Sequence, residues 1–512
     1  MKKVIRLFIF VVLISIFVGG GYWLFMKKGN NTFVDTRKVY NQADNNKEAI
    51  SGICRDCNVI LVTLDTLRAD HLSSYGYSRD TSKNIDELAK RGVLFENNFV
   101  QMPYTPTSHW SILSGTYPHT HKHYSPGVIN NKKTLKNNTT NLITKVLTKN
   151  KYTNLAVMGS KMVVNLAPEF DKAVLIKTER IKHTSKKVTD KALELIKSNK
   201  NNNFFMWIHY WDPHQPYLPP SEYIYQDNKK VFPDGYVYSR DYVNNDSQSN
   251  NFGKVEYLKN YNISLKMQQA YDGEIKHTDE EFGRVLNLLQ ELNLDKKTII
   301  VITSDHGELF GEHKDGNFNL QKFNKPVFEH YETLYDEEIR TPLIIYNPKS
   351  NFKNKKIDSL VQEIDIAPTI LGMLGIDIPN NIEGKNLQPI INGQIKKVND
   401  YIFSILKFVR DEASMGGKWK ERNLRKLRAT LRTEKWKLIR FENIKNNQTE
   451  IIYVLYDLAN GENENVLEEN EKIADDMIKQ LESMIAEDKS ISDDISLSKE
   501  ELDVLRSLGY LK

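Results

Sequence analysis

Short apolar runs that recur between amphipathic segments constrain the fold of this chain most strongly. Three such runs have the length and composition of strands buried on both faces of a sheet. They are residues 58–65, 204–209 and 298–304. Apolar residues at spacings of three and four predict helices between them, over residues 85–91, 142–149, 188–197 and 267–292. Strands that alternate with helices predict an α/β fold, a three-layer sandwich around a central, mainly parallel sheet.

The pattern changes beyond about residue 395. Alternation of apolar and polar residues in Leu427–Arg432 and Lys437–Phe441 predicts antiparallel strands, and a charged helix is expected near Ile473–Ile485. We therefore predict a main domain over residues 56–395 and a small C-terminal antiparallel sheet-and-helix subdomain over residues 396–512. Loops rich in Asn and Tyr at 221–262 and 314–329 are where specificity is expected.

The N-terminus carries a segment long enough to cross a bilayer. Residues 7–26 are uncharged, and basic residues stand on both sides of them. A cleaved signal peptide has a similar pattern, but the run is long and has no clear small-x-small cleavage site, which favours an uncleaved anchor over residues 1–28. Lys2, Lys3 and Arg6 favour a cytoplasmic N-terminus. We expect one pass through the cytoplasmic membrane, a polar linker over residues 29–55, and a periplasmic or extracellular main domain.

The chain has two cysteines, Cys54 and Cys57. Their spacing suits a redox pair, half a zinc site or a small disulfide, and the extracytoplasmic placement favours the disulfide. The formal net charge of +5 is small, and five of the basic residues flank the apolar segment. This charge distribution argues against a nucleic-acid partner.

Acidic and imidazole side chains follow two of the predicted strands. Asp65 ends the first run, and Asp305 with His306 follows the third. Because ligands bind beyond the carboxyl ends of strands in open α/β sheets, these residues are expected at one edge, where they suit one divalent metal ion such as Ca²⁺, Mg²⁺, Mn²⁺ or Zn²⁺. Taken singly, each aspartate is better explained as the cap of a helix or turn.

A hydroxyl-rich turn enters a short apolar helix at Thr105, and the helix ends at Gly115. An anion at a helix start meets unpaired N–H groups, and a threonine held on a cation there can lose its proton and act as a nucleophile. The alternative is a capped helix with no catalytic role. His209 ends the second run, and His214 follows it. His214 has the chemistry to protonate a leaving oxygen or to hold the oxyanion, although either histidine, taken singly, is more often structural.

Several motifs follow one another along the chain in a recognisable order. They are Asn58–Leu72 with Tyr75–Tyr77, Thr105–Gly115 with Tyr117–His119, His209–His214, Tyr271–Glu274, Ser304–Glu308 with Gly311–His313, Arg340–Ile345, Asp365–Ile370, Leu455–Leu458 and Leu505–Leu511. Over roughly residues 56–512, these motifs and their order resemble those of the sulfatase family within the alkaline-phosphatase superfamily.

The resemblance implies roles for individual residues. It places the metal ligands at Asp65, Asp305 and His306 and the nucleophile at Thr105. His109 stands where the family has an arginine that steadies the nucleophile. His214 matches a histidine that contacts substrate, while His209 and His330 are further substrate-binding candidates, His330 lying where sulfatases keep a lysine.

Departures from the family pattern concern the nucleophile and the ligands. Sulfatases convert a cysteine or serine of a C/S-x-P-x-R motif into formylglycine, whereas residues 105–109 read Thr-Pro-Thr-Ser-His. The second aspartate of the family's Asp-Asp pair is Thr66, and no Lys-x-His motif is evident near Gly159–Met162. A threonine beside an Asp-His pair is similar to phosphodiesterases and to phosphoglycerol- or phosphoethanolamine-type transferases of the superfamily.

The leading hypothesis is a metal-dependent hydrolase that cleaves a sulfate or phosphate ester through Thr105. Its expected partner is a sulfated or phosphorylated small molecule, glycan or lipid head group, with the membrane bound through the N-terminal helix. Transfer of a head group to an envelope lipid or glycan is an alternative. A second alternative is an inactive binding protein on a sulfatase scaffold.

Overall fold

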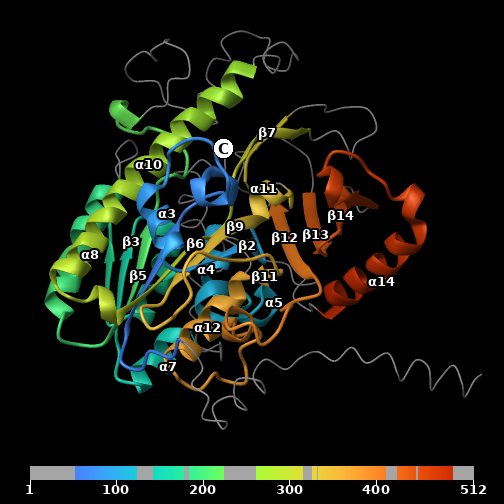
Figure 1. Ribbon diagram of the computed structural model, residues 1–512. Coiled ribbons are helices and arrows are strands. Elements are labelled where there is room, and N and C mark those ends of the chain that lie inside the picture. Colours follow the sequence, from blue (N-terminus) through green and yellow to red (C-terminus); the bar gives the residue numbers. More distant parts are fainter. Residues whose placement is uncertain are drawn as a thin grey trace, which may run out of the picture. The chain divides into compact units, whose positions relative to one another are not determined.

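The computed structural model describes residues 52–123, 142–177, 184–223, 261–314, 326–330, 333–410, 424–445 and 448–487. Within these residues, nine strands form the central sheet (Figure 1). They are β1 (Asn58–Leu64), β2 (Val93–Phe99), β3 (Thr153–Met158), β4 (Lys172–Leu175), β5 (Phe204–Tyr210), β6 (Thr298–Ser304), β9 (Arg340–Tyr346), β10 (Lys355–Ile357) and β11 (Val361–Gln362).

The sheet is mixed but mostly parallel. Its order is β10-β2-β9-β6-β1-β5-β3-β4, with β11 also paired to β2. Only β9 runs antiparallel to its neighbours among these strands, β2 and β6. The predicted α/β class is therefore confirmed. The position of β1 between β5 and β6 matters most for function, because it brings the carboxyl ends of the three predicted strands side by side.

Helices cover both faces of this sheet, because alternate residues of each strand point to opposite sides. Val59 and Leu61 of β1 pack in one core with helices α4 (Thr105–Ser114), α7 (Ile143–Lys149) and α12 (Ile366–Met373). Ile60 and Val62 pack in the other core with α3 (Lys83–Lys90), α8 (Ser185–Asn199) and α10 (Tyr261–Glu291). The result is the predicted three-layer sandwich.

A second sheet follows the first in the chain. Strands β12 (Ile402–Arg410), β13 (Leu424–Arg432), β14 (Trp436–Lys445) and β15 (Gln448–Asp457) pair antiparallel in that order. Helix α14 (Glu471–Glu487) packs on it, and the same core takes in Phe99, Met102 and Tyr104 of the main domain. The antiparallel sheet closed by a helix is as predicted. The domain boundary near residue 395 stays a prediction.

Ionic contacts join the two sheets through α11 (Asp336–Ile339). Asp336 contacts Arg432 at 3.2 Å and the buried Lys437 at 2.7 Å, and Lys437 also contacts Glu462 at 2.7 Å. Burial opposes ionisation of Asp336, but Arg432 and Lys437 outweigh it and hold the pKa of its carboxyl well below the usual range. The backbone carbonyls of the two residues after Asp336 accept the N–H groups of Gly307 and Glu308, so this junction supports the loop that carries His306.

We expect Asp336→Asn to lower the free energy of unfolding at pH 7 by about 2 kcal/mol, because it leaves two cations beside one remaining acid. The folded-state pKa of Asp336 is depressed, so its contribution is fully present above the unfolded pKa of about 4 and is lost progressively as pH falls from there through the folded-state pKa. The difference between wild type and variant in urea unfolding should therefore begin to shrink near about pH 5 and continue to shrink to below about pH 3. The control is the exposed Asp400, paired with Lys397. An Asp336→Asn effect as small as that of Asp400→Asn would contradict the assignment.

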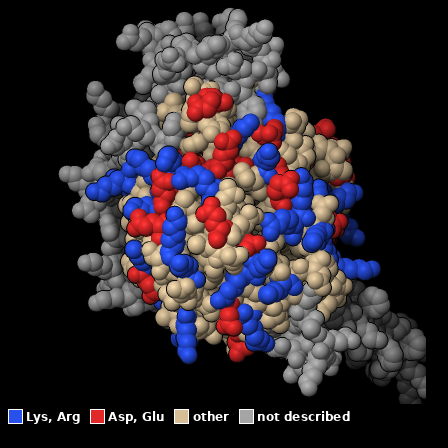
Figure 2. Space-filling model, turned by 60° about the vertical axis from the view of Figure 1, so that its left-hand side comes forward, with Lys and Arg blue, Asp and Glu red and all other residues tan. Residues whose placement is uncertain are grey.

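Several predicted features lie partly or wholly outside the described residues: the spanning segment 7–26, the linker up to residue 51, most of loops 221–262 and 314–329, and the tail. No helix in the part of the chain that the structure describes is long and apolar enough to span a bilayer. Cys54 and Cys57 form the predicted disulfide just before β1. Figure 2 shows acidic and basic side chains interspersed over one face of the molecule.

Candidate active site

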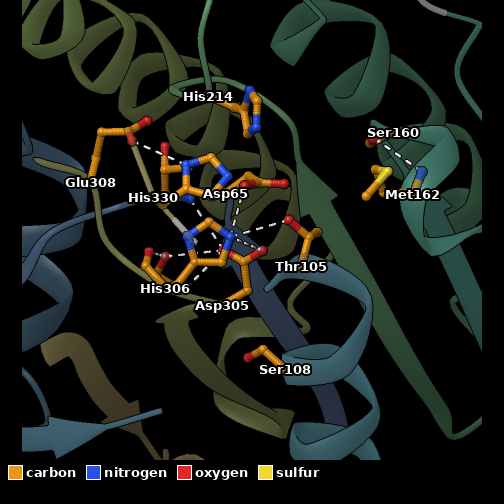
Figure 3. A network of polar contacts seen from close by, with 12 residues as sticks. Asp65, Thr105, Ser108, Ser160, Met162, His214, Asp305, His306, Glu308 and His330 are labelled. Carbon is orange, nitrogen blue, oxygen red and sulfur yellow. Dashed lines mark hydrogen bonds and ion pairs between the residues drawn. The ribbon is translucent and has the colours of Figure 1, made fainter. Parts of the chain in front are cut away.

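The carboxyl ends of β1 and β6 bring three predicted ligands together (Figure 3). The Nε2 atom of His306 lies 3.5 Å from Oδ2 of Asp305 and 3.9 Å from Oδ1 of Asp65. One potential ligand atom from each residue lies within 4.8 Å of the other two. All three side chains are fully buried. The structure thus gathers the acids and the imidazole that the sequence places after separate strands.

Unsatisfied polar atoms indicate what this cluster binds. Both carboxylate oxygens of Asp65 and Oδ2 of Asp305 are buried and have no hydrogen-bond partner within the described part of the chain. The Nδ1 atom of His306 donates to the carbonyl of Gly307 at 3.0 Å, which turns Nε2 toward the carboxylates. Buried charges without partners are costly, and carboxylate oxygens with one imidazole are suitable ligands for a divalent ion. These residues therefore fit the expected metal.

The two carboxylates differ in electrostatic environment. Burial, followed by Asp305 and Glu308, raises the pKa of the Asp65 carboxyl well above its usual range. Burial also acts on Asp305, but His306, His109 and the backbone N–H of Thr66 outweigh it and lower its pKa. The Thr66 N–H donates to Oδ1 of Asp305 at 3.1 Å. In place of a second carboxylate, residue 66 thus supplies a backbone donor that orients Asp305.

Thr105 lies directly beside this cluster. It is the first residue of α4, and its Oγ1 is 3.2 Å from Nε2 of His306. Pro106 at the start of the helix and Gly115, with φ 65°, at its end account for the bounds of this helix. The threonine hydroxyl therefore meets the metal-ligand cluster at the start of a helix, which suits an anionic group.

His109 contacts the backbone of Thr105, not its hydroxyl. Its Nδ1 donates to the Thr105 carbonyl at 2.7 Å, and its Nε2 lies 3.0 Å from Oγ1 of Thr63. Trp207 donates to the same Thr63 oxygen at 3.0 Å. Burial lowers the pKa of His109, so the ring is neutral, and Thr63 donates to its Nε2. His109 thus positions the first turn of α4 and brings no positive charge, unlike the arginine of the family pattern.

His209 lies next to Asp65, one of the three predicted ligands. Its Nε2 is 3.4 Å from Oδ2 of Asp65, its ring centroid is 4.9 Å from that of His109, and it is fully buried. Burial, with His109 and His214, lowers the pKa of His209 well below its usual range. Its geometry is that of a neighbour of a metal ligand, and direct contact of His209 with substrate stays a prediction.

His214 and His330 lie close to each other beside the metal-ligand cluster (Figure 3). Their ring centroids are 5.1 Å apart, and the ring of His330 lies 4.3 Å from that of His306. His214 stacks on Trp211 at 3.8 Å and donates through Nδ1 to the carbonyl of Gln215. Burial is the main cause that lowers the pKa of both rings well below the usual range. Both imidazoles are therefore neutral until an anion binds beside them.

Glu308 is a residue whose role the sequence does not predict. Its Oε1 is 3.0 Å from Nδ1 of His330, and its Oε2 accepts from the Tyr217 hydroxyl at 2.8 Å. Burial raises the pKa of Glu308 to about 8. The one sequence signal was its place in the motif at Ser304–Glu308. Near Gly159–Met162, where the Lys-x-His motif is missing, the structure has an exposed Lys161 and a buried Met162.

This fold, with paired acids, an imidazole and a hydroxyl at the carboxyl edge of its sheet, defines an ester hydrolase of the alkaline-phosphatase superfamily. The family model described as Sulfatase matches residues 57–376, and a second, N-sulphoglucosamine sulphohydrolase, C-terminal, matches residues 327–490. The chain belongs to the sulfatase family.

Individual relatives agree with this assignment. An N-acetylglucosamine-6-O-sulfatase of Bacteroides thetaiotaomicron is 24% identical over 423 residues, which cover 67% of this chain and 72% of the relative. A solved structure in complex with its substrate D-glucosamine-2-N,6-O-disulfate has a TM-score of 0.63 at 21% identity and covers 85% of this chain and 99% of its own. The structure of a phosphonate monoester hydrolase from Silicibacter pomeroyi has a TM-score of 0.62 at 20% identity, and the match covers 87% of this chain and 98% of the hydrolase chain. These structures have the same fold.

Proposed function

We propose that this protein is a metal-dependent hydrolase that cleaves a sulfate or phosphate ester through a covalent intermediate on Thr105. The observation that carries the proposal is the distance of 3.2 Å between the Thr105 hydroxyl and Nε2 of His306, inside a group of unsatisfied carboxylate oxygens. A divalent ion held by Asp65, Asp305 and His306 would balance the carboxylates and lower the pKa of the hydroxyl.

The residues of the chain then have separate tasks. The Thr105 oxygen forms a bond to the sulfur or phosphorus atom as the bond to the leaving alcohol oxygen breaks. The backbone N–H groups of Thr105 and Thr107, at the start of α4, would attract the oxygens of the transferred group, since Pro106 has no N–H and that of Ser108 donates to the Tyr104 carbonyl. An anion bound beside His214 raises the pKa of this imidazole, which then donates a proton to the leaving oxygen. Water next attacks the same centre and gives one proton to the imidazole. The bond from this centre to the Thr105 oxygen breaks, and this oxygen takes back from solvent the proton that Thr105 released to solvent before its attack.

The threonine favours phosphate over sulfate. Formylglycine hydrate carries two hydroxyls on one carbon, so its ester can collapse by elimination. A threonine ester has no second hydroxyl there, and water must break the bond to sulfur or phosphorus directly. The phosphonate monoester hydrolase among the structural neighbours is consistent with a phosphorus centre. The sulfated sugar bound to another neighbour keeps a glycan sulfate among the candidate substrates.

A substrate panel tests this proposal. The purified protein, supplied in turn with Zn²⁺, Mn²⁺, Mg²⁺ and Ca²⁺, should hydrolyse at least one aryl phosphate monoester, phosphodiester, phosphonate monoester or aryl sulfate. We expect the phosphorus esters to have the higher kcat/KM. A head group that appears on an added glycan or lipid acceptor, and not in free solution, would instead establish the transferase alternative. Absence of both activity and bound metal would favour the inactive scaffold.

We also propose that the catalytic domain lies outside the cytoplasmic membrane, attached by residues 7–26. The support is the apolar sequence of that segment and the disulfide between Cys54 and Cys57, because disulfides persist in oxidising compartments. A membrane-impermeant protease added to intact cells with a permeabilised outer layer should remove the catalytic domain. Full protection of the domain would contradict the placement.

A further inference from the structure

Three buried ionisable side chains form a second cluster that shares no residue with the Asp65 site. Asp212 lies in the loop after β5, and Glu274 and His277 lie on α10. One potential ligand atom from each residue lies within 4.8 Å of the other two. The residues are 6%, 3% and 8% exposed, respectively. The i, i+3 spacing of Glu274 and His277 places both on the same face of the helix, toward Asp212.

Glu274 has an unsatisfied oxygen in this cluster. Its Oε1 accepts from the Leu218 N–H at 2.7 Å, whereas Oε2 is buried and has no hydrogen-bond partner among the described residues. Asp212 is different, because it accepts from the backbone N–H groups of Thr184 and Ser185, at 2.9 and 2.8 Å, at the start of α8. In this cluster, Oε2 of Glu274 is therefore the atom that needs a cation or a proton beside it.

The local charge is uncompensated as well. Burial and then the nearby Asp212 raise the pKa of Glu274 well above its usual range. Among the contacts of both carboxylates in the described part of the chain, none is with a lysine or arginine. Two carboxylates buried close together require a proton or a metal ion between them. A neighbouring imidazole adds a third ligand that a shared proton would not need.

We propose that Asp212, Glu274 and His277 bind a second divalent transition-metal ion. Two carboxylate oxygens and one imidazole nitrogen are ligands typical of Zn²⁺ or Mn²⁺. The ion connects three elements: the loop after β5, the start of α8 through Asp212, and α10. His214 follows Asp212 by two residues, so the ion fixes the loop that carries this imidazole. The role of this site is structural and does not depend on the chemistry proposed for Thr105.

Metal content tests the inference directly. The full chain is stripped with a chelator, reloaded with Zn²⁺ alone or Mn²⁺ alone, and analysed for metal per chain. We expect two ions in wild type, one in His277→Gln, one in Asp305→Asn and none in the double variant. Glu291→Gln, which changes an exposed carboxylate on the same helix, is the matched control and should keep two. A single ion in wild type that persists in His277→Gln and vanishes in Asp305→Asn would overturn the inference.

Thermal unfolding of Asp305→Asn provides a measurement that does not depend on the His277 variant being folded. Added Zn²⁺ or Mn²⁺ should raise its melting temperature, because an ion bound only to the folded state stabilises it. No shift and no bound ion in Asp305→Asn would show that the carboxylates share a proton. Ester hydrolysis by wild type is measured separately, so loss of this site and failure of the proposed function are distinguishable.

Discussion

Thr105→Ala should lower kcat/KM by at least about 10⁴-fold, since loss of a nucleophile removes the covalent route and leaves only binding and electrostatic stabilisation. The side chain sits at the first position of α4, so the helix needs no rearrangement to accept alanine. Thr105→Ser keeps the hydroxyl and should retain measurable activity. The measurement is steady-state hydrolysis of the best substrate from the panel, with circular dichroism to verify folding.

Thr107 provides a matched control for Thr105. It lies on the same helix and is equally buried, but its hydroxyl donates to the His123 carbonyl at 2.6 Å and not into the site. We expect Thr107→Ala to lower stability by about 1 kcal/mol through the lost hydrogen bond, with kcat/KM changed only a few-fold. Equal losses of activity in the two alanine variants would indicate a structural effect of α4 and would contradict the nucleophile assignment.

Removal of the metal should have the second largest effect. Asp305→Asn replaces a ligand whose Oδ2 accepts no hydrogen bond from any residue that the structure describes, and activity should fall by at least about 10³-fold with loss of the bound ion. Chelation of wild type should have a similar effect, reversed by adding back the metal. A chelated enzyme that is free of metal and fully active would exclude this role.

Metal affinity should also depend on pH. The raised pKa of Asp65 means that a proton competes with the ion for this carboxylate. The dissociation constant for the metal should therefore rise as pH falls, by up to about tenfold per pH unit below that pKa when one proton is displaced. Calorimetric titrations at several pH values measure this slope. A constant affinity across the range would show that no ligand is protonated in the metal-free protein.

The fold was predictable because its main signals are local. Continuous apolar runs predict strands such as β1 and β6, and the acids directly after them reach the same edge once those strands pair. The order of strands in the sheet was not predictable, because pairing joins segments far apart in the chain. The antiparallel β9, for example, inserts between β2 and β6, and no local pattern in its sequence indicates this direction.

Sequence alone predicted those site residues whose position directly after a strand, at a helix start or in a motif already indicates their role. Asp65, Thr105, Asp305 and His306 were selected in that way, and the structure places them together. The contact of His109 with the Thr105 carbonyl depends on the rotamer of a ring inside a helix. Glu308 and His330 are in contact, but the segment between them includes residues 314–329, whose sequence has no clear helical or strand periodicity. Such contacts arise from tertiary packing and leave little trace in a single sequence.

The most direct test of the central claim is the mass of the peptide that contains Thr105 after rapid acid quenching of enzyme during turnover. If the threonine oxygen is the nucleophile, this peptide carries one phosphoryl or sulfuryl group on Thr105, and the group is absent in Thr105→Ala. A modification on Ser108 instead, or single-turnover hydrolysis with no labelled Thr105 at any time point, would contradict it.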